Sequence, residues 1–489
     1  MSDFIGVLPV AVLALWGCIL LLVDVFYFEK RTNVTAWLAA AGMALTLVLT
    51  LVVHSGQEML VYNGMISVDG FAVFLSVLFL VSGMIAVLLS YDYLERMGIN
   101  RGEYYTLMIF AITGMILMGY ASDLIVTFLA LELLSIPLYV LSGFARPRVS
   151  SEESAMKYFL LGAFASGFFV YGVALIFGAT GTTNFAEIVD VLTARTANIT
   201  LLLSGAGMLV VGLGFKVGAV PFHMWTPDVY QGAPSAVTAF MAVGAKVGGF
   251  AALLRIFVVA FGDHYELVNG MTGVFWGLAA ITMIVGNILA ISQKNIKRLL
   301  AYSSVSQAGY IMMALVPFGQ PDVAKDTIAS GLFYLLSFAI TSFGVWAVVI
   351  ALEKVVKDGD GMHKGLELED YAGLGQRYPL LATAMTVFML SFTGLPPTLG
   401  FAAKLYVFRT AIEGGFMGLA VIGVVTSLIS AFYYLRIVII MFMQDGEPEV
   451  YPQRWLSTTA VTAAVATVVL TIFASPLFSW AANSVVQLF

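Results

Sequence analysis

The chain alternates between long apolar runs and short polar connections. Runs long enough to cross a bilayer, at about twenty residues each, recur along the whole sequence. They fall near residues 4–27, 34–54, 71–91, 104–121, 123–143, 155–178, 200–225, 235–261, 271–291, 298–316, 326–352, 378–412, 416–442 and 457–485. This pattern predicts an all-α polytopic membrane protein of about fourteen transmembrane helices. The first run is too long for a signal-peptide core and no basic segment precedes it, so we expect a retained helix.

Composition supports the same class and excludes several others. The 489 residues are 60% hydrophobic and 11% charged, with a mean hydropathy of +0.96, outside the usual range of soluble domains. A net charge of −6 without a long basic run disfavours nucleic-acid binding. The one cysteine, Cys18, excludes an internal disulfide or a cysteine-ligated iron–sulfur cluster within the chain. The four scattered histidines predict no metal site: His54, His223, His264 and His363.

The connections between the apolar runs indicate the orientation in the membrane. Even the longest, 353–377, is too short to fold around a core of its own, so we expect the working parts within the membrane. With fourteen helices, most connecting Lys and Arg residues fall on one side: Lys30, Arg31, Arg96, Arg101, Arg146, Arg148, Lys294, Lys297, Arg298, Lys354, Lys357, Lys364, Arg377 and Arg454. Positive loops face the cytoplasm, which predicts that both termini are non-cytoplasmic. The absence of a targeting peptide favours a bacterial cell inner membrane.

The middle of the chain contains two similar units. The segment 158–168 aligns with 333–343 at an offset of 175 residues. We therefore predict three N-terminal helices, two five-helix repeats and a C-terminal helix, with boundaries at 1–103, 104–262, 263–443 and 444–489. Because five is odd, the second repeat starts from the opposite face of the membrane, as in secondary transporters with inverted repeats.

Each repeat is expected to contain one broken helix, near 218–225 and 394–400. At an offset of 176, Gly218 and Pro221 align with Gly394 and Pro397. A proline leaves the carbonyl four residues before it without its helical partner, and Pro396 adds a second such break. Freed backbone at membrane depth usually lines a hydrated cavity, although a packing kink is the simpler alternative.

Four charged residues lie far from water in this arrangement: Glu132, Lys216, Lys246 and Lys404. At about 2.5–3.5 kcal/mol each, they represent roughly 10 kcal/mol of insertion penalty, which structure alone rarely tolerates. A carboxylate beside a buried lysine favours the charged form, so making or breaking a Glu132–Lys216 pair would load or unload a proton. The structural alternative is a buried salt bridge that holds two helices together.

Other charged residues allow two interpretations. Lys157 follows Glu153 by one helical turn and is either functional or extends its side chain toward the interface. His223 and Asp228, after the first break, either pass protons to the cytoplasmic side or form a solvated turn. Near helix ends, extension of the side chain toward the interface is expected for Arg255, Arg409 and Arg436.

Four motifs together resemble the antiporter-like subunits of respiratory complex I. They are LALELLSIPLYVL, GLGFKVGAVPFHMWTPDVYQGAPSAVTAF, SQKNIKRLLAYSSVSQAGY and LSFTGLPPTLGFAAKLYVF. The resemblance covers nearly the whole chain and is strongest for the subunit N type of proton-translocating NADH-quinone oxidoreductase. No long lateral helix follows the last apolar run, and Lys404 stands where M-type subunits carry Glu.

The resemblance implies roles for individual residues. Glu132 and Lys216 would form a coupled pair, Lys157 would assist near that pair, Lys246 would be the central relay, and Lys404 the terminal proton site. It also implies that this chain binds no cofactor and is not catalytic alone, because FMN, iron–sulfur clusters, NADH and quinone belong to other subunits. The implied partners are the antiporter-like subunits M and L and the small subunit K.

The second unit departs from the first in its titratable groups. At the offset of 175, Glu132 aligns with Gln307. The middle of the relay is therefore expected to depend on water and on hydroxyl groups such as those of Tyr310 and Ser391.

Two other functions remain as alternatives. A subunit of a multi-subunit cation/proton antiporter would show cation-dependent exchange together with its partners. A membrane scaffold would not need the buried lysines, and their replacement by Leu or Met would be neutral or stabilising.

Overall fold

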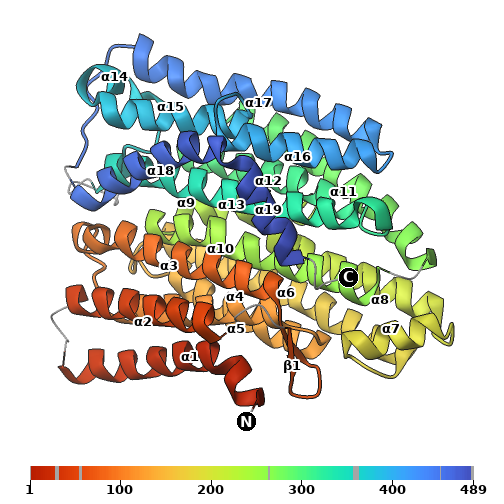
Figure 1. The fold of residues 1–489 in the computed structure, drawn as a ribbon. Coiled ribbons are helices and arrows are strands. Elements are labelled where there is room, and N and C mark those ends of the chain that lie inside the picture. Colours follow the sequence, from red (N-terminus) through yellow and green to blue (C-terminus); the bar gives the residue numbers. More distant parts are fainter. Residues whose placement is uncertain are drawn as a thin grey trace.

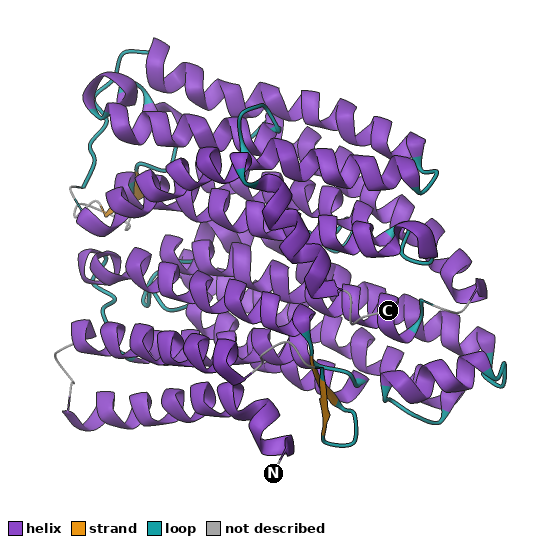
Figure 2. Ribbon diagram, in the orientation of Figure 1, coloured by secondary structure: helices purple, strands orange, loops and turns teal. Residues whose placement is uncertain are grey.

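The molecule is a bundle of helices with α1 at one edge and α17 at the other, while the last helices, α18 and α19, return to the middle beside α13 and α3 (Figure 1). The computed structural model describes residues 2–27, 32–53, 58–262, 265–355, 363–451 and 453–485. Within these residues helices dominate and the strands are very short (Figure 2). The predicted all-α membrane architecture is therefore confirmed. His54, His264, Lys30, Arg31 and Lys357 lie outside the described residues.

The N-terminal part contains three long helices and a small hairpin. Its elements are α1 (Ser2–Tyr27), α2 (Thr32–Val53), β1 (Met59–Val61), β2 (Ile66–Val68) and α3 (Gly70–Arg96). The hairpin was not predicted, because strands of three residues carry no usable periodicity. Asp69 begins α3 as its N-cap and accepts a hydrogen bond from the Ala72 amide at 2.8 Å.

The next part corresponds to the predicted first repeat. Its elements are α4 (Glu103–Tyr120), α5 (Leu124–Ser142), α6 (Val149–Thr180), α7 (Phe185–Thr193), α8 (Ile199–Val217), α9 (Trp225–Gly232), α10 (Ser235–Leu254) and the π-helix η1 (Arg255–Ala260). The short helix α7 was not predicted, since its nine residues are too few to form an apolar run. It begins at the N-cap Asn184, whose side chain accepts from two backbone amides.

The remaining elements cover the predicted second repeat and the C-terminal helix. They are α11 (Tyr265–Ile291), α12 (Ile296–Met312), η2 (Met313–Leu315), α13 (Pro321–Leu352), β3 (Lys354–Val355), β4 (His363–Lys364), η3 (Leu368–Tyr371), α14 (Leu374–Arg377), α15 (Pro379–Thr393), α16 (Leu399–Glu413), α17 (Met417–Met443), α18 (Arg454–Ile472) and α19 (Ala474–Val485). The last predicted run, 457–485, is thus two helices. Pro476 explains the division, because its ring clashes with the carbonyl of Ile472, where α18 ends.

Every predicted apolar run contains a helix, but the number of spans is not settled by length alone. In the described residues, twelve helices are long and apolar enough to cross a membrane by themselves. The helices α12, α15 and α16 are shorter, with 17, 15 and 15 residues. The count of fourteen, the repeat boundaries and the inverted relation stay predictions.

The two predicted helix breaks have the same backbone geometry. Helix α8 ends at Gly218, which has a φ of +73°, and the Val220–Pro221 peptide bond is cis. Helix α15 ends at Gly394, which has a φ of +85°, and the Pro396–Pro397 bond is cis. Glycine suits both positions because side chains rarely tolerate a positive φ. Each break therefore begins at a glycine in the left-handed region, and the alignment of the two units stays a prediction.

Helix α10 lies at the centre of the bundle. All of its residues are buried, and it packs against α3, α4, α5, α8 and α13. Small residues permit this close packing. At Gly249, a Cβ atom would lie 2.7 Å from a methyl carbon of Val217, so glycine allows α8 and α10 to approach. That approach brings the backbones that carry Lys216 and Lys246 together.

Candidate functional site

Glu132 and Lys216 lie near each other but do not form a direct ion pair in the described structure. Lys216 is 3% exposed, and its Nζ donates to Ser135 Oγ at 2.7 Å. Glu132 is half-buried, and its Oε1 accepts from Ser166 Oγ at 2.5 Å. Since Ser135 follows Glu132 by one turn of α5, both lie on the same side of that helix. Glu132 and Lys216 therefore interact electrostatically, while each side chain hydrogen-bonds to a different serine.

Aromatic rings surround the Lys216 ammonium. Its Nζ lies 6.0 Å from the ring centre of Tyr139 and 5.6 Å from that of Tyr158, within the range of a cation–π interaction. Tyr158 stacks on Trp225 with ring centres 4.5 Å apart. The Trp225 indole in turn donates to the carbonyl of Phe215 at 2.9 Å, which ties the two sides of the first break together.

Lys246 is held by neutral groups. It is 3% exposed, its Nζ donates to the carbonyl of Ser304, and it lies 5.8 Å from the ring centre of Phe338. A small cavity of about 10 Å³ borders this contact, and Ser303 and Ser304 both contribute to its lining. No carboxylate forms an ion pair with Lys246 in the part of the chain that the structure describes.

A network of uncharged side chains begins next to Lys246. The Ser303 and Tyr434 hydroxyls are 2.5 Å apart. Gln307 Nε2 donates to the Tyr434 hydroxyl at 3.2 Å and to the carbonyl of Phe392 at 3.2 Å. Its Oε1 accepts from the Tyr334 hydroxyl at 2.5 Å. The expectation that hydroxyl groups replace titratable ones around Gln307 matches this arrangement.

Lys404 lies at the second helix break. It is 4% exposed, and its Nζ donates to the carbonyl of Thr393 and to Ser427 Oγ, each at 2.9 Å. Thr393 is the residue whose carbonyl Pro397 leaves free, so the lysine takes the place of the missing amide. The ring centre of Tyr310 is 4.4 Å from the ammonium.

Tyr310 belongs to the same polar group. Its hydroxyl donates to Thr426 Oγ1 at 3.1 Å and lies 3.4 Å from the Asn287 amide nitrogen. Ser391 is also buried, with its hydroxyl 3.0 Å from that of Thr341. Both predicted hydroxyl residues are therefore in hydrogen-bonded positions close to the second break.

Lys157 forms a separate cluster at the first break. Its Nζ lies 2.7 Å from Glu153 and 2.7 Å from Asp228, and Arg298 binds the other oxygen of Asp228 at 2.8 Å. Partial burial alone would raise the pKa of Asp228, but the hydrogen bonds from the two cations outweigh it and hold that pKa below its usual value. Lys157 thus contacts Asp228 and not the Glu132–Lys216 group. His223 is half-buried nearby, with its ring centre 6.5 Å from that of Tyr302.

One of the three arginines expected to extend toward the interface, Arg255, does not do so. Arg255 is 2% exposed, and its Nη1 and Nη2 bind the two oxygens of Asp69 at 2.5 and 2.9 Å. Arg436 donates to the carbonyls of Ile291 and Gln293 at the end of α11. Arg409 does behave as expected, with an exposed side chain beside Glu413. The position of Arg255 near a helix end did not indicate its burial, because Asp69 and the carbonyl of Gly119 from other helices enclose it.

The sequence did not single out several residues that contact the buried lysines. These are Ser135, Tyr158, Ser304, Thr393 and Ser427. Serine, threonine and tyrosine are common in membrane helices, so their composition carries no signal without the packing. No group of three metal-ligating side chains occurs in the described ranges.

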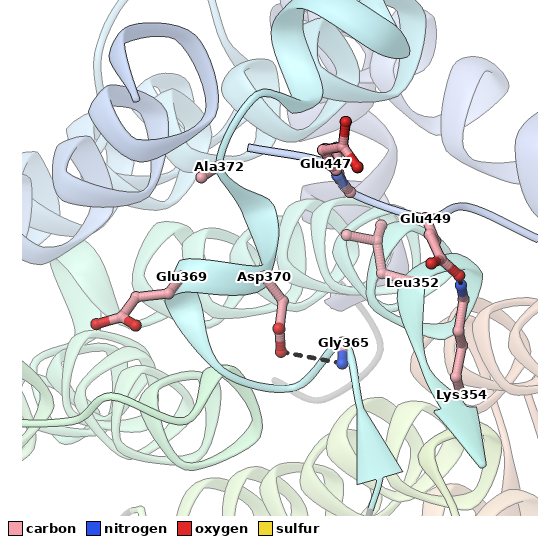
Figure 3. Close-up of a pocket in the computed structure, with 9 residues that line it drawn as sticks. Leu352, Lys354, Gly365, Glu369, Asp370, Ala372, Glu447 and Glu449 are labelled. Atoms are coloured by element: carbon pink, nitrogen blue, oxygen red, sulfur yellow. Dashed lines mark hydrogen bonds and ion pairs between the residues drawn. The ribbon is translucent and has the colours of Figure 1, made fainter. Parts of the chain in front are cut away.

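A pocket lined by polar side chains lies away from these lysines. It is lined by residues after α13, around η3 and after α17, and Glu369, Asp370, Glu447 and Glu449 bring carboxylates to it (Figure 3). Lys354 pairs with Glu449, and Asp370 accepts from the Gly365 amide at 2.9 Å. Its side chains come from the connecting segments, so it is not the site that the buried lysines form.

Comparison with known proteins identifies the family. Residues 121–430 match the family model described as NADH:quinone oxidoreductase/Mrp antiporter, TM. The chain is 46% identical to NADH-quinone oxidoreductase subunit N of Chloroflexus aggregans, over 98% of this chain and 96% of that protein. It is 44% identical to subunit N of Trichlorobacter lovleyi, with 94% and 90% covered. The chain belongs to the NADH-quinone oxidoreductase subunit N family.

Solved structures agree with this family and show how widely its fold occurs. A chain of respiratory complex I from Thermus thermophilus is 33% identical, with a TM-score of 0.80 over 96% of this chain and 98% of that chain. A chain of the Mrp complex from Dietzia has a TM-score of 0.84 at 23% identity, with 100% and 97% covered. At this low identity, the similarity to the Mrp chain shows only that the two chains share a fold. Subunit N is the proton-translocating membrane subunit of complex I, so sequence identity, not fold, favours complex I over an antiporter.

Proposed function

We propose that this chain translocates protons through Glu132, Lys216, Lys246 and Lys404 as part of a bacterial complex I. One observation carries the proposal: three lysines at most 4% exposed have ammonium groups that contact serine hydroxyls, backbone carbonyls and aromatic rings. Neutral partners stabilise a buried charge less than a carboxylate does. Each lysine is therefore poised to lose its proton.

The spacing of these groups forms a route through the bundle. Lys216 donates to Ser135, one turn from Glu132 on α5, and α8 packs against α10, which carries Lys246. From Lys246, the contact with Ser304 leads to α12, where the neighbouring Ser303 begins the hydrogen-bonded network toward the second break. Rotating hydroxyls and occasional water molecules can pass protons along such a network.

The second break couples the network to Lys404. Pro396 and Pro397 leave the carbonyls of Phe392 and Thr393 free, and these accept from Gln307 and Lys404. The last two groups of the route are thus joined through adjacent backbone carbonyls. Lys404 is the terminal site in this proposal.

Lys157, His223 and Asp228 have a secondary role. Their cluster beside the first break keeps a charged, half-exposed group close to Tyr158, which contacts Lys216. We assign them to proton exchange between the first break and the aqueous side.

The redox part of the reaction belongs elsewhere in the complex. We assign FMN, iron–sulfur clusters and quinone to other subunits, as the family resemblance implies, and the single cysteine of this chain is consistent with the part that concerns iron–sulfur clusters. The proposed partners are the antiporter-like subunits M and L and the small subunit K. The Lys- and Arg-rich face is assigned to the cytoplasm, and both termini to the opposite side.

The test is Lys246→Met in the assembled enzyme, with NADH–quinone electron transfer and proton pumping measured in sealed membrane vesicles. Met has a similar length but carries no proton. We expect both rates to fall together by at least about tenfold while assembly is retained. The matched control is Lys325→Met, which removes an exposed lysine from α13. Normal pumping with Lys246→Met would refute the relay.

A subunit of a cation/proton antiporter is the second candidate, because its family model and fold are shared. It would give sodium- or potassium-dependent proton exchange without NADH. Pumping that depends on NADH and not on these cations excludes it.

A further inference from the structure

A second group of buried charges lies where several helices end on the Lys- and Arg-rich face. Glu353 directly follows α13 and is 1% exposed, while Lys297 in the first turn of α12 is 2% exposed. Lys297 Nζ donates to the carbonyl of Ala233, just before α10, at 2.6 Å. Glu353 interacts electrostatically with Lys297 and with Arg96. The relay from Glu132 to Lys404 does not use these residues.

Structural anchoring alone would account for part of this cluster. Arg96 Nη2 donates to the carbonyl of Ile350 at 2.6 Å and thereby ties α3 to α13. The hydroxyl of Tyr93 accepts from the Ser235 amide at 2.9 Å, which fixes the start of α10. These contacts hold the helix ends together without Glu353 or Lys297. The two buried charges therefore need another explanation.

The small cavity beside Lys246 lies between that lysine and the cluster. Ala242 of α10, Ser304 of α12 and Ser342 of α13 line it. The hydroxyl of Ser304 is buried near the Tyr230 hydroxyl, while its carbonyl accepts from Lys246. A cavity of about 10 Å³ holds about one water molecule, which the serine hydroxyls would bind.

Helical spacing connects the cavity to the cluster. On α12, Lys297 precedes the lining residue Leu300 by three positions. On α13, the lining residue Trp346 precedes Glu353 by seven positions, which is two helical turns. Residues at these intervals lie on one side of a helix. Along the axis of α10, Lys246 lies about 16 Å from Ser235 at the start of the helix, at a rise of 1.5 Å per residue.

The open acidic pocket lies at the outer end of this line. Leu352 and Lys354, the neighbours of Glu353 in the chain, both line it (Figure 3). The pocket has a volume of about 300 Å³ and contains the carboxylates of Glu369, Asp370, Glu447 and Glu449. Clustered carboxylates raise the local concentration of protons at a surface.

We propose that the pocket, the buried Glu353–Lys297 cluster and the cavity beside Ser304 form a proton uptake path from the Lys- and Arg-rich face to Lys246. In each cycle the carboxylate of Glu353 takes a proton from hydronium in the pocket, leaving water. It then releases the proton to water in the cavity, and the neutral amine of Lys246 accepts it and becomes ammonium. The electrostatic interaction with Lys297 returns Glu353 to its carboxylate form. This inference rests on the proposed role of Lys246 as a proton carrier.

The first test replaces Glu353 by Gln in the assembled enzyme. We expect pumping and coupled electron transfer to fall by at least about tenfold, since proton transfer through a carboxyl group is lost. The ratio of the rates in water and deuterium oxide should rise, because proton uptake becomes rate-limiting. Glu353→Asp, which keeps a carboxyl group, should restore most of the rate. Glu413→Gln, at an exposed position on α16, is the control with the same chemical change.

Two results would overturn the uptake path. One is pumping within about twofold of the wild type in Glu353→Gln. The other is a loss in both Glu353 variants with an unchanged isotope ratio, which a purely structural role would give. If Glu353→Gln does not assemble, Ser342→Leu tests the uptake path instead, because leucine would fill the cavity. It should slow pumping, and normal pumping in Ser342→Leu refutes the path.

The test separates this inference from the proposed function. If Lys246→Met abolishes pumping while the Glu353 and Ser342 variants pump normally, the relay stands and the uptake path is wrong. If Lys246→Met pumps normally, the relay itself is wrong.

Discussion

Arg255 and Asp69 provide the sharpest test of the packing around α10. The guanidinium binds both carboxylate oxygens, and it also donates to the carbonyl of Gly119 at 3.1 and 2.6 Å. The two side chains are 2% and 1% exposed. Replacing Asp69 by Asn keeps its size and its cap on α3 but leaves the guanidinium charge buried without a counter-charge. Loss of one partner from a buried pair costs about 3–5 kcal/mol.

The effect should depend strongly on whether the other charge remains. We expect Asp69→Asn and Arg255→Met each to lower the thermal stability of the detergent-solubilised complex and its yield. The double variant should lose less stability than the sum of the two single losses. The difference should be about 0.5–3 kcal/mol, because neither charge is then left unpaired.

The assay is the temperature at which half of the complex is lost from its size-exclusion peak. Arg409→Met is the control, since it removes an arginine from an exposed pair with Glu413 and should leave that temperature unchanged. The reasoning fails if Asp69→Asn is as stable as the wild type, or if the two single effects are additive.

Two further predictions concern the hydrogen bonds of the relay. Ser135→Ala removes a hydroxyl that binds Lys216 at 2.7 Å, and a bond to a charged group contributes about 1.5–3 kcal/mol. Pumping in vesicles should fall about tenfold or more with normal assembly, and an unchanged rate would show that the Lys216–Ser135 hydrogen bond has no part in the relay. Gln307→Leu leaves the carbonyl of Phe392 unpaired, at a cost of about 1–3 kcal/mol. The thermal stability and the pumping rate of the Gln307→Leu enzyme should both fall. If neither falls, water replaces the amide.

The sequence predicted those features that depend on local chain properties. Apolar length located the helices, and the prolines located both breaks together with the carbonyls that they free. The burial of Lys216, Lys246 and Lys404 also followed, because each stands in the middle of an apolar run. Such residues have no aqueous environment within reach, whatever the packing.

Features that depend on tertiary packing could not be predicted. Arg255 and Glu353 stand near helix ends, where water is normally available, yet neighbouring helices bury both. The serine that binds Lys216 is visible only when α5 and α8 are placed together. The division between α18 and α19 was missed because Pro476 lies within an otherwise continuous apolar run.

The shared geometry of the two breaks has a consequence for how the units diverged. At the offset of 176 residues, Lys404 aligns with Asp228. One position thus carries a cation that binds a freed carbonyl inside the bundle, and the other carries an anion held by Lys157 and Arg298 at its edge. Under the predicted alignment, equivalent places carry opposite charges, so a transplant of side chains from one half to the other would reverse the local polarity. Likeness of backbone between the halves is therefore no guide to the direction in which each half handles a proton.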